Sequence, residues 1–323
     1  MNYSKKITEA VAEEFAAKRY EWDSLKKQRL KEVYSLCPEI KEIDIALSDV
    51  GLKIARATLM GKVGLSERIE SIKNDNLKLQ KRRGELLCSL GFDEGYTDPP
   101  HSCEKCADTG YVGVKLCSCY REALIKKAYE CSGLGNLLFS QSFENFSLDS
   151  LEGEDRERME QYYSSLVKYA DEFSVKTAAS LLMVGGTGLG KTHLSSAVAK
   201  RIIDRGFDVV YENAQNIFFD FERDRFSDRF SGEEPVSFKY LDCDLLIIDD
   251  LGSEMISSFS VSCLYNLINS RLNKGLPIIV STNFTSEALR KKYDDRITSR
   301  LFGEFTILLF TGKDQRRKKL SKK

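Results

Sequence analysis

The chain has 323 residues and a mass of 36.7 kDa, which suggests about two domains, each able to bury a core. Hydrophobic residues make up 42% of the sequence and charged residues 30%, with 49 basic and 49 acidic side chains, and this composition excludes a disordered or collagen-like chain. No stretch approaches the roughly 20 apolar residues that span a bilayer, and the charged N-terminus lacks a signal-peptide core. We therefore expect neither a secreted nor a membrane protein.

The N-terminal region, residues 1–98, is predicted to be a helical domain. A helix begins at Pro38, where the missing N–H of proline is not needed. Apolar residues then recur at alternating spacings of three and four, and a poorer stripe follows after Gly61 and Gly64, so an antiparallel helical hairpin is expected. The two stripes are Ile40, Ile43, Leu47, Val50, Ile54 and Ala57, and then Leu65, Ile69, Ile72, Leu79 and Leu86. This hairpin is either a plain packing domain or a partner-binding arm.

A cysteine-rich module and a following helix, Arg121 to Cys131, are predicted at residues 99–132, after Asp98-Pro99-Pro100 breaks the helical pattern and isolates the module from the helix before it. Two pairs of thiols with short spacings suit a tetrahedral Zn²⁺ site, and glycines between the pairs let the chain double back. The candidate ligands are Cys103, Cys106, Cys117 and Cys119. Because four protein ligands leave no open coordination position, the metal is expected to be structural.

Other interpretations of these cysteines stay open. An iron–sulfur cluster uses the same thiolates, and His101 is a possible substitute for one of them. A redox-active pair is disfavoured because the CxxC motif lies in no βαβ context. The remaining cysteines are scattered and the total of nine is odd, which is typical of a protein in the reducing cytoplasm.

An α/β domain is predicted at residues 160–323, after a linker at residues 133–159 that carries Phe139, Phe143 and Phe146. Short apolar runs alternate with amphipathic segments, a pattern typical of a parallel sheet covered by helices on both faces. The expected strands are Leu181–Val184, Phe207–Tyr211, Leu245–Ile248, Ile278–Ser281 and Phe305–Phe310.

A phosphate-binding loop is expected directly after the first of these strands. The letters GGTGLGKT match GxxxxGK[ST] and precede an apolar helix, which is the context that the motif requires. Glycines let backbone N–H groups surround phosphate, Lys191 would neutralise the β- and γ-phosphates, and the Thr192 hydroxyl would bind Mg²⁺. A chance glycine-rich turn is the alternative. The candidate nucleotide-binding residues are Gly185, Gly186, Thr187, Gly188, Leu189, Gly190, Lys191, Thr192 and His193.

Polar residues that end two further strands complete a candidate hydrolytic site. A phosphate loop should be paired with an acid on a neighbouring strand, and Asp249 would hold Mg²⁺ there. Asp250, which points elsewhere, is placed to polarise the attacking water as general base. Asn283 is placed to orient that water or to touch the γ-phosphate. When each motif is taken alone, the alternative is that these polar residues only form the turns that follow their strands.

An arginine supplied to a neighbouring subunit is the last candidate group. The letters RITSR span Arg296 to Arg300, far from the phosphate loop in sequence, and such an arginine stabilises transition-state charge in trans. A surface salt-bridging arginine is the alternative.

The motifs together resemble AAA+ ATPases of the DnaC/DnaI and IstB type, which are bacterial helicase loaders and transposition helpers. The resemblance rests on GGTGLGKTHL, LLIIDDLG, IIVSTN and DRITSRL in this order and covers residues 140–323, while DTGY at Asp108–Tyr111 is similar to the DnaI-like branch. It implies that Lys191, Thr192 and Asp249 bind Mg-ATP.

The resemblance also implies roles for the other candidates. Asp250 would activate water, Asn283 would be the sensor, and Arg300 would be the finger, with Arg296 as its rival. Arg316 would contact the γ-phosphate in cis, although Arg317 is adjacent.

The implied fold is an AAA+ core without the usual C-terminal helical lid, because only a short segment follows the last expected strand. The loader family shares this feature. The segment Phe143–Phe146 would border the adenine site, or both phenylalanines would be hinge packing.

The implied function is ATP-dependent helicase loading in DNA replication. The expected partners are a replicative helicase, single-stranded DNA and further copies of the chain, and the expected cofactors are ATP, Mg²⁺ and Zn²⁺. The basic run from Arg316 to Lys323 lacks aromatic residues, so it is a solvated tail or a non-specific attraction for DNA. A transposition helper and a non-enzymatic nucleotide switch are the alternatives.

Overall fold

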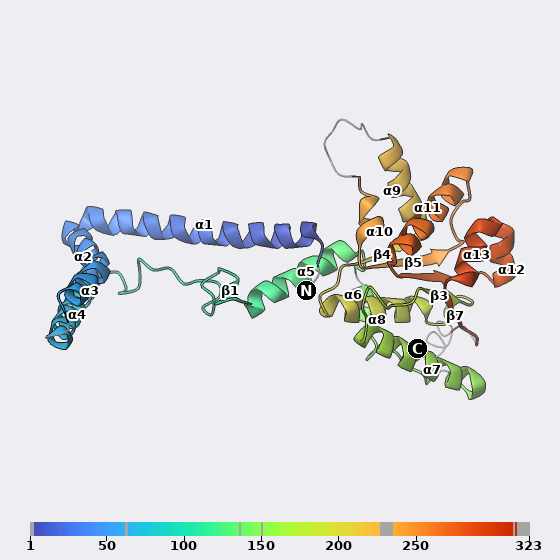
Figure 1. Ribbon diagram of the computed structural model, residues 1–323, viewed down its shortest axis with the longest axis horizontal. Helices are drawn as coiled ribbons and strands as arrows, with labels where there is room; N and C mark the ends of the chain where they lie inside the picture. Colours follow the sequence, from blue (N-terminus) through green and yellow to red (C-terminus); the bar gives the residue numbers. More distant parts are fainter. Residues whose placement is uncertain are drawn as a thin grey trace. The chain divides into compact units, whose positions relative to one another are not determined.

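The structure, a computed structural model, describes residues 3–61, 64–135, 137–149, 151–226, 235–312 and 314. The chain forms two compact units (Figure 1). One consists of Ala12–Tyr120, and the other of Met1–Val11 together with Arg121–Lys323. We call them the helical unit and the α/β unit and describe each by itself. Among the helices of the described ranges, none combines the length and the apolar character needed to span a lipid bilayer.

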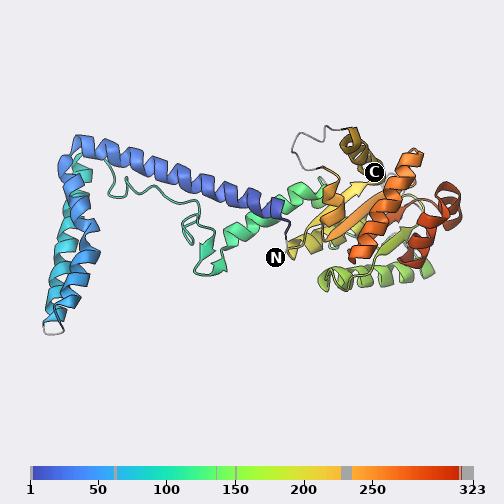
Figure 2. The same ribbon diagram turned by 45° about the horizontal axis from the view of Figure 1, so that its top comes forward.

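The helical unit contains most of a long helix and a hairpin, in which α4 packs against α2 and α3 (Figure 2). Pro38 occupies the first turn of its helix, as predicted, but a break at Asp49 divides the predicted first arm into two helices. The helices are α1 (Lys5–Leu36), α2 (Pro38–Ser48), α3 (Val50–Leu59) and α4 (Leu65–Ser89).

The apolar seam of the hairpin is buried at its base and interrupted further along the first arm. Val33, Ile40 and Leu87 are fully buried and form the core of this unit. Ile54, which was expected in the seam, is 40% exposed. The prediction of a continuous seam is therefore wrong at Ile54, whereas Ala57, which lies closer to the tip, is buried.

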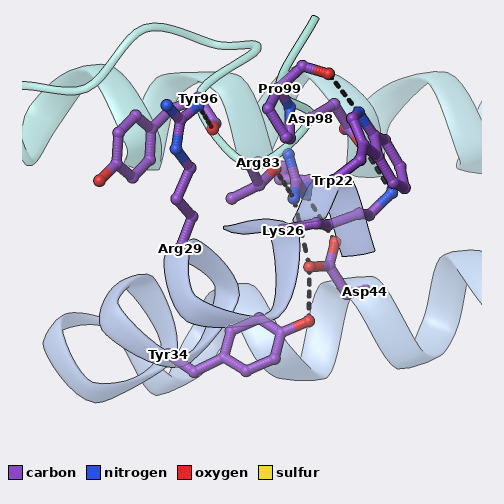
Figure 3. A network of polar contacts seen from close by, with 10 residues as sticks. Trp22, Lys26, Arg29, Tyr34, Asp44, Arg83, Tyr96, Asp98 and Pro99 are labelled. Atoms are coloured by element: carbon purple, nitrogen blue, oxygen red, sulfur yellow. Dashed lines mark hydrogen bonds and ion pairs between the residues drawn. The ribbon is translucent and has the colours of Figure 1, made fainter. Parts of the chain in front are cut away.

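The residues that follow the hairpin run along α1 and are bound to it (Figure 3). The Trp22 indole N–H donates to the carbonyl of Pro99 at 2.6 Å, and the Lys26 ammonium pairs with Asp98 at 2.5 Å. Two residues of Asp98-Pro99-Pro100 therefore attach the cysteine module to α1.

A third contact extends this attachment toward the hairpin. The Arg29 guanidinium donates to the carbonyl of Tyr96 at 2.8 Å and lies over the Tyr96 ring. We call the contacts of Trp22, Lys26 and Arg29 with residues 96–99 the α1 clamp. Along α1 the contacting residues run from 22 to 29, while the residues that they contact run from 99 back to 96. The segment is therefore antiparallel to α1. Arg83 of α4 reaches the same segment and donates to the Thr97 hydroxyl at 2.8 Å.

A five-stranded parallel sheet in the order β4-β5-β6-β3-β7 forms the centre of the α/β unit (Figure 1). All five predicted strands are present: β3 coincides with its prediction, the ends of the other four differ by at most three residues, and the α/β fold class is confirmed. The strands are β3 (Leu181–Val184), β4 (Val209–Asn213), β5 (Leu245–Leu251), β6 (Ile278–Thr282) and β7 (Thr306–Leu309).

Helices cover both faces of this sheet, as expected for strands that are apolar on both sides. Alternate residues of the central strands, such as Leu246 and Ile248, pack with α9, α11 and α13 in one buried cluster. α7 and α8 pack together on the other face (Figure 2). The helices are α5 (Ser118–Ser132), α6 (Leu137–Ser140), α7 (Gly153–Asp171), α8 (Lys191–Asp204), α9 (Ala214–Phe226), α10 (Phe238–Asp242), α11 (Ser258–Lys274), α12 (Ser286–Lys292) and α13 (Asp295–Gly303).

Candidate nucleotide site and cysteine cluster

The phosphate loop connects β3 to the first turn of α8. Gly188 and Gly190 have φ angles of 73° and 93°, a left-handed conformation that favours glycine. Gly190 is also the residue before the first turn of α8, and a Cβ at this position would crowd the ring of Phe146. Backbone N–H groups at such a helix start attract anions, so the loop has the backbone geometry of a phosphate site.

Lys191 is buried inside this loop. Its ammonium donates to the carbonyls of Gly185 and Gly186, both at 2.7 Å, and to Oδ1 of Asn283 at 2.8 Å. The residue that sequence analysis assigned to the phosphates therefore lies beside the residue that it assigned as the sensor.

Strand order explains why Lys191 and Asn283 meet. β6, which ends directly before Asn283, pairs with β3 on one side and with β5 on the other. The acidic strand is therefore not the neighbour of the phosphate-loop strand, and the prediction of a neighbouring strand is wrong. Because the carboxyl ends of parallel strands share one sheet edge, Asn283 lies between the loop and the aspartates, and its Nδ2 donates to Oδ1 of Asp250.

Asp249 lies beside Thr192, as expected for two ligands of one Mg²⁺ ion. The Thr192 hydroxyl is 3.4 Å from Oδ1 of Asp249, and the Ser281 hydroxyl donates to the same oxygen. Oδ2 accepts a hydrogen bond from the Tyr211 phenol at 2.8 Å. Both carboxylate oxygens are thus held in place.

Tyr211 and Ser281 are the positioning residues that sequence analysis missed. They lie near the ends of β4 and β6, the two strands that flank β5. The polar ends of these strands were visible in the sequence, but their relevance depends on strand order. Burial, and then the nearby Asp249 carboxylate, raise the pKa of the Tyr211 phenol, so it remains a donor at neutral pH.

Asp250 leaves the regular alternation of its strand. Its φ angle is 55°, in the left-handed region, and the pairing of β5 with β6 shifts register between Ile248 and Leu251. Successive side chains of a regular strand point to opposite faces, whereas this bulge lets Asp250 reach Asn283 while Asp249 reaches Thr192.

The linker packs against the start of α8. Nε2 of His193 is 2.8 Å from the carbonyl of Ser142, and the Phe146 ring contacts the His193 ring edge-on. Phe143 is buried and meets the ring of Tyr163. Phe143 therefore fits the packing interpretation, whereas Phe146 borders the phosphate loop.

The candidate arginines lie on α13. Ile297 and Leu301 of this helix are buried in the core, and Arg300 lies over the Tyr265 ring of α11, with a guanidinium-to-centroid distance of 5.4 Å. Arg296 is exposed. Their assignment as a trans-acting group stays a prediction.

Arg316, Arg317 and the rest of the basic tail lie outside the described residues. The same holds for most of the short segment after β7, which was expected to be too short for a helical lid. The Asp314 carboxylate lies against Gly188 of the phosphate loop. The chain that follows β7 therefore passes the loop, because β7 is the parallel neighbour of β3.

The cysteine cluster has the dimensions of a tetrahedral thiolate site. The four predicted sulfur atoms all lie within 4.8 Å of one another, and the Sγ–Sγ distances are 3.8 Å for Cys103–Cys117 and 3.5 Å for Cys106–Cys119. A Zn–S bond of about 2.3 Å gives tetrahedral edges of about 3.8 Å. The four side chains therefore fit a metal ion of this size.

The backbone of the module holds these thiols in place. A short hairpin of β1 (Tyr111–Val112) and β2 (Lys115–Leu116) joins the two cysteine pairs. The backbone N–H of Cys119 lowers the pKa of the Cys117 thiol to about 7, which favours the thiolate that binds metals. His101 is not a member of the four-residue group and stacks on Trp22 instead.

Comparison with known proteins gives relatives of the α/β unit. A family model described as IstB-like ATP binding protein matches residues 139–320. The replicative helicase loader DnaC of Escherichia coli strain K12 is 25% identical over 181 residues, which cover 56% of this chain and 71% of that protein. The chromosomal replication initiator protein DnaA of Aliarcobacter butzleri is 42% identical over 71 residues, which cover 22% of this chain and 16% of that protein.

Solved structures include similar chains. The crystal structure of the DnaC helicase loader aligns with a TM-score of 0.47 at 19% identity and covers 55% of this chain and 100% of that chain. The crystal structure of DnaI aligns with a TM-score of 0.44 at 19% identity and covers 55% and 92%.

Proposed function

The chain belongs to the family of IstB-like ATP-binding proteins, and from this premise we propose that it hydrolyses ATP to load a replicative helicase onto DNA. One observation carries the enzymatic part of the proposal. The strand order brings the phosphate loop, Asn283 and the two aspartates to one edge of the sheet, where Lys191 contacts Asn283 and Asn283 contacts Asp250.

The binding step is assigned to the loop and to two oxygen ligands. Backbone N–H groups of residues 185–190 and the Lys191 ammonium hold the triphosphate. The Thr192 hydroxyl and the Asp249 carboxylate are the hard oxygen ligands that Mg²⁺ prefers. When bound, Mg²⁺ supplies positive charge to the β- and γ-phosphates.

The hydrolytic step is assigned to Asp250 and Asn283. Water attacks the γ-phosphate, the Asp250 carboxylate accepts the proton of that water, and ADP leaves with inorganic phosphate as the second product. Asn283, which donates to Asp250 and accepts from Lys191, orients the carboxylate and the water between them.

Replacement of Asp250 tests this step. Asparagine tolerates a left-handed backbone, so Asp250→Asn should keep the fold and the affinity for ATP while steady-state hydrolysis falls about 10²- to 10⁴-fold. Glu157→Gln, which neutralises an exposed carboxylate on α7, is the matched control and should keep full activity. Activity that is unchanged in Asp250→Asn would support a nucleotide-binding adaptor whose switch needs no hydrolysis.

The assembly is proposed to complete each site in trans. Arg300 is assigned as the residue that a neighbouring copy supplies to the γ-phosphate, with Arg296 as the alternative on the same helix. Arg316 is assigned to the γ-phosphate of its own subunit, which the position of Asp314 beside Gly188 supports.

A structural Zn²⁺ ion is proposed at Cys103, Cys106, Cys117 and Cys119. The sulfur distances support this assignment. The ion would close a loop-rich segment that has little core of its own.

The helical unit is proposed to bind the replicative helicase, and the assembled α/β units to bind single-stranded DNA. The similarity to the DnaC loader supports this role. The description of the matching family as IstB-like supports a second candidate, a helper ATPase for a transposase. Affinity capture of the native protein separates the two, since a hexameric helicase as main partner supports loading and a transposase supports the alternative.

A further inference from the structure

We propose that metal binding at the cysteine cluster closes the α1 clamp, with Asp108 as the positioning residue that connects the two. This inference rests on the proposed metal site. It assigns a role to two ring contacts with α1, that of His101 with Trp22 and that of Tyr120 with Phe15. Neither nucleotide binding nor metal ligation uses these contacts.

Asp108 is the residue that holds the first cysteine pair. Its side chain is only 3% exposed, and its φ of 57° turns it back toward the start of the module. The two carboxylate oxygens accept hydrogen bonds from the backbone N–H groups of Ser102 and Cys103, at 2.8 and 2.9 Å. The position of Cys103 in the cluster thus depends on this carboxylate.

The same carboxylate reaches the α1 clamp through His101. Nδ1 of His101 is 3.5 Å from Oδ2 of Asp108, and the imidazole stacks on Trp22 with a centroid distance of 4.4 Å and an interplanar angle of 15°. The Trp22 indole N–H is the donor to Pro99 that begins the clamp (Figure 3). A continuous path therefore runs from Cys103 through Asp108 and His101 to α1.

A second attachment lies at the other end of the module. Tyr120 directly follows Cys119, and its ring contacts Phe15 of α1 at a centroid distance of 4.8 Å. Gly110 leaves room for this ring, because a Cβ there would overlap it. Phe15 and Trp22 are seven residues apart, so they lie on one face of α1 and both ends of the module meet that face.

Metal dependence follows from how little else shapes the module. Before α5 begins at Ser118, the regular structure of residues 99–117 is a hairpin of two strands with two residues each, and such a segment gains most of its folding free energy from the ion. Without metal, the thiols have no reason to converge, so His101 and Tyr120 lose their positions against α1.

The experiment uses the full chain, stripped with a chelator and titrated with Co²⁺, whose thiolate bands report loading of the cluster. Trp22 is the sole tryptophan, so its emission reports the clamp independently of activity. We expect Trp22 emission and the hydrogen-exchange protection of residues 15–29 to change together and to saturate at one equivalent. Full thiolate bands without either change would overturn the inference, whereas absence of loading would instead overturn the proposed metal site.

Two variants separate the path from the ligands. Asp108→Asn tolerates the left-handed backbone and should weaken Co²⁺ binding about 10- to 100-fold. Asp93→Asn, which changes an exposed acid of the same unit, should bind Co²⁺ as the wild type does. His101→Ala should load fully and yet lose the Trp22 response. Loss of loading in His101→Ala would make His101 a ligand and would also overturn the inference.

Discussion

At the scale of single residues, the candidate site depends on side chains that hold other side chains. Asp249 is positioned by Tyr211 and Ser281, and Asp250 by Asn283. Partners of this kind fix the orientation of a metal ligand, and their removal typically lowers metal affinity or activity by one to two orders of magnitude.

Removal of the Tyr211 phenol is therefore predicted to change the metal requirement. In Tyr211→Phe, Asp249 loses the donor to Oδ2, so the Mg²⁺ concentration for half-maximal ATPase activity should rise about tenfold or more. Titration of ATPase activity with Mg²⁺ measures this directly.

The control for this variant is Tyr169→Phe, which removes the phenol of a half-buried tyrosine that donates to the carbonyl of Ala179. It should leave the Mg²⁺ requirement unchanged. If both variants only lower the melting temperature by similar amounts, Tyr211 is a packing residue and its contact with Asp249 has no part in metal binding.

At the scale of elements, sequence patterns predicted which segments form strands but not their order. Runs such as Leu245–Ile248 are identified by their length and apolar character, and they end at polar residues. The insertion of β6 between β3 and β5 arises from packing between segments far apart in the chain, so no local pattern encodes it. For this reason Asn283 was predicted as a site residue, whereas Tyr211 and Ser281 were not.

Local backbone geometry limited the predictions in the same way. The bulge at Asp250 and the helix break at Asp49 each fall on an aspartate, and the nearest glycines, Gly252 and Gly51, lie two residues further on, so neither position was marked in advance. The cysteine cluster was predictable because metal ligation constrains spacing, while the role of Asp108 depends on a hydrogen-bonded turn.

One buried arginine connects the elements behind the site and allows a prediction of stability. Arg271 of α11 is fully buried and donates to the carbonyls of Tyr240, Cys243 and Pro277. Arg271→Met leaves these carbonyls without their donor and should lower the unfolding free energy by about 3 kcal/mol or more.

Thermal unfolding of the full chain measures this effect. The matched control is Lys274→Met on the same helix, which removes an exposed ion pair with Asp242 and should change stability by less than about 1 kcal/mol. Equal losses in the two variants would mean that the buried hydrogen bonds of Arg271 add nothing beyond helix packing.

At the scale of the whole molecule, the proposed mechanism needs more than one copy of the chain. An arginine supplied in trans makes hydrolysis depend on assembly, so two inactive variants should complement each other. Mixing Arg300→Ala with Lys191→Ala should restore part of the ATPase activity, because one mixed interface combines an intact phosphate loop with an intact arginine.

Steady-state ATPase activity of the mixture, compared with each variant alone, tests this prediction. Arg296→Ala mixed with Lys191→Ala is the parallel experiment for the rival arginine on α13. If neither mixture gains activity while sedimentation shows intact assembly, the active site lies within one subunit.

The account as a whole depends on where a nucleotide and its metal bind. A crystal structure with a non-hydrolysable ATP analogue and Mn²⁺ tests this most directly, since anomalous scattering locates the ion. We expect the triphosphate within residues 185–192 and the ion beside Thr192 and Asp249. Nucleotide bound elsewhere, or an ion away from both of these side chains, would contradict the account.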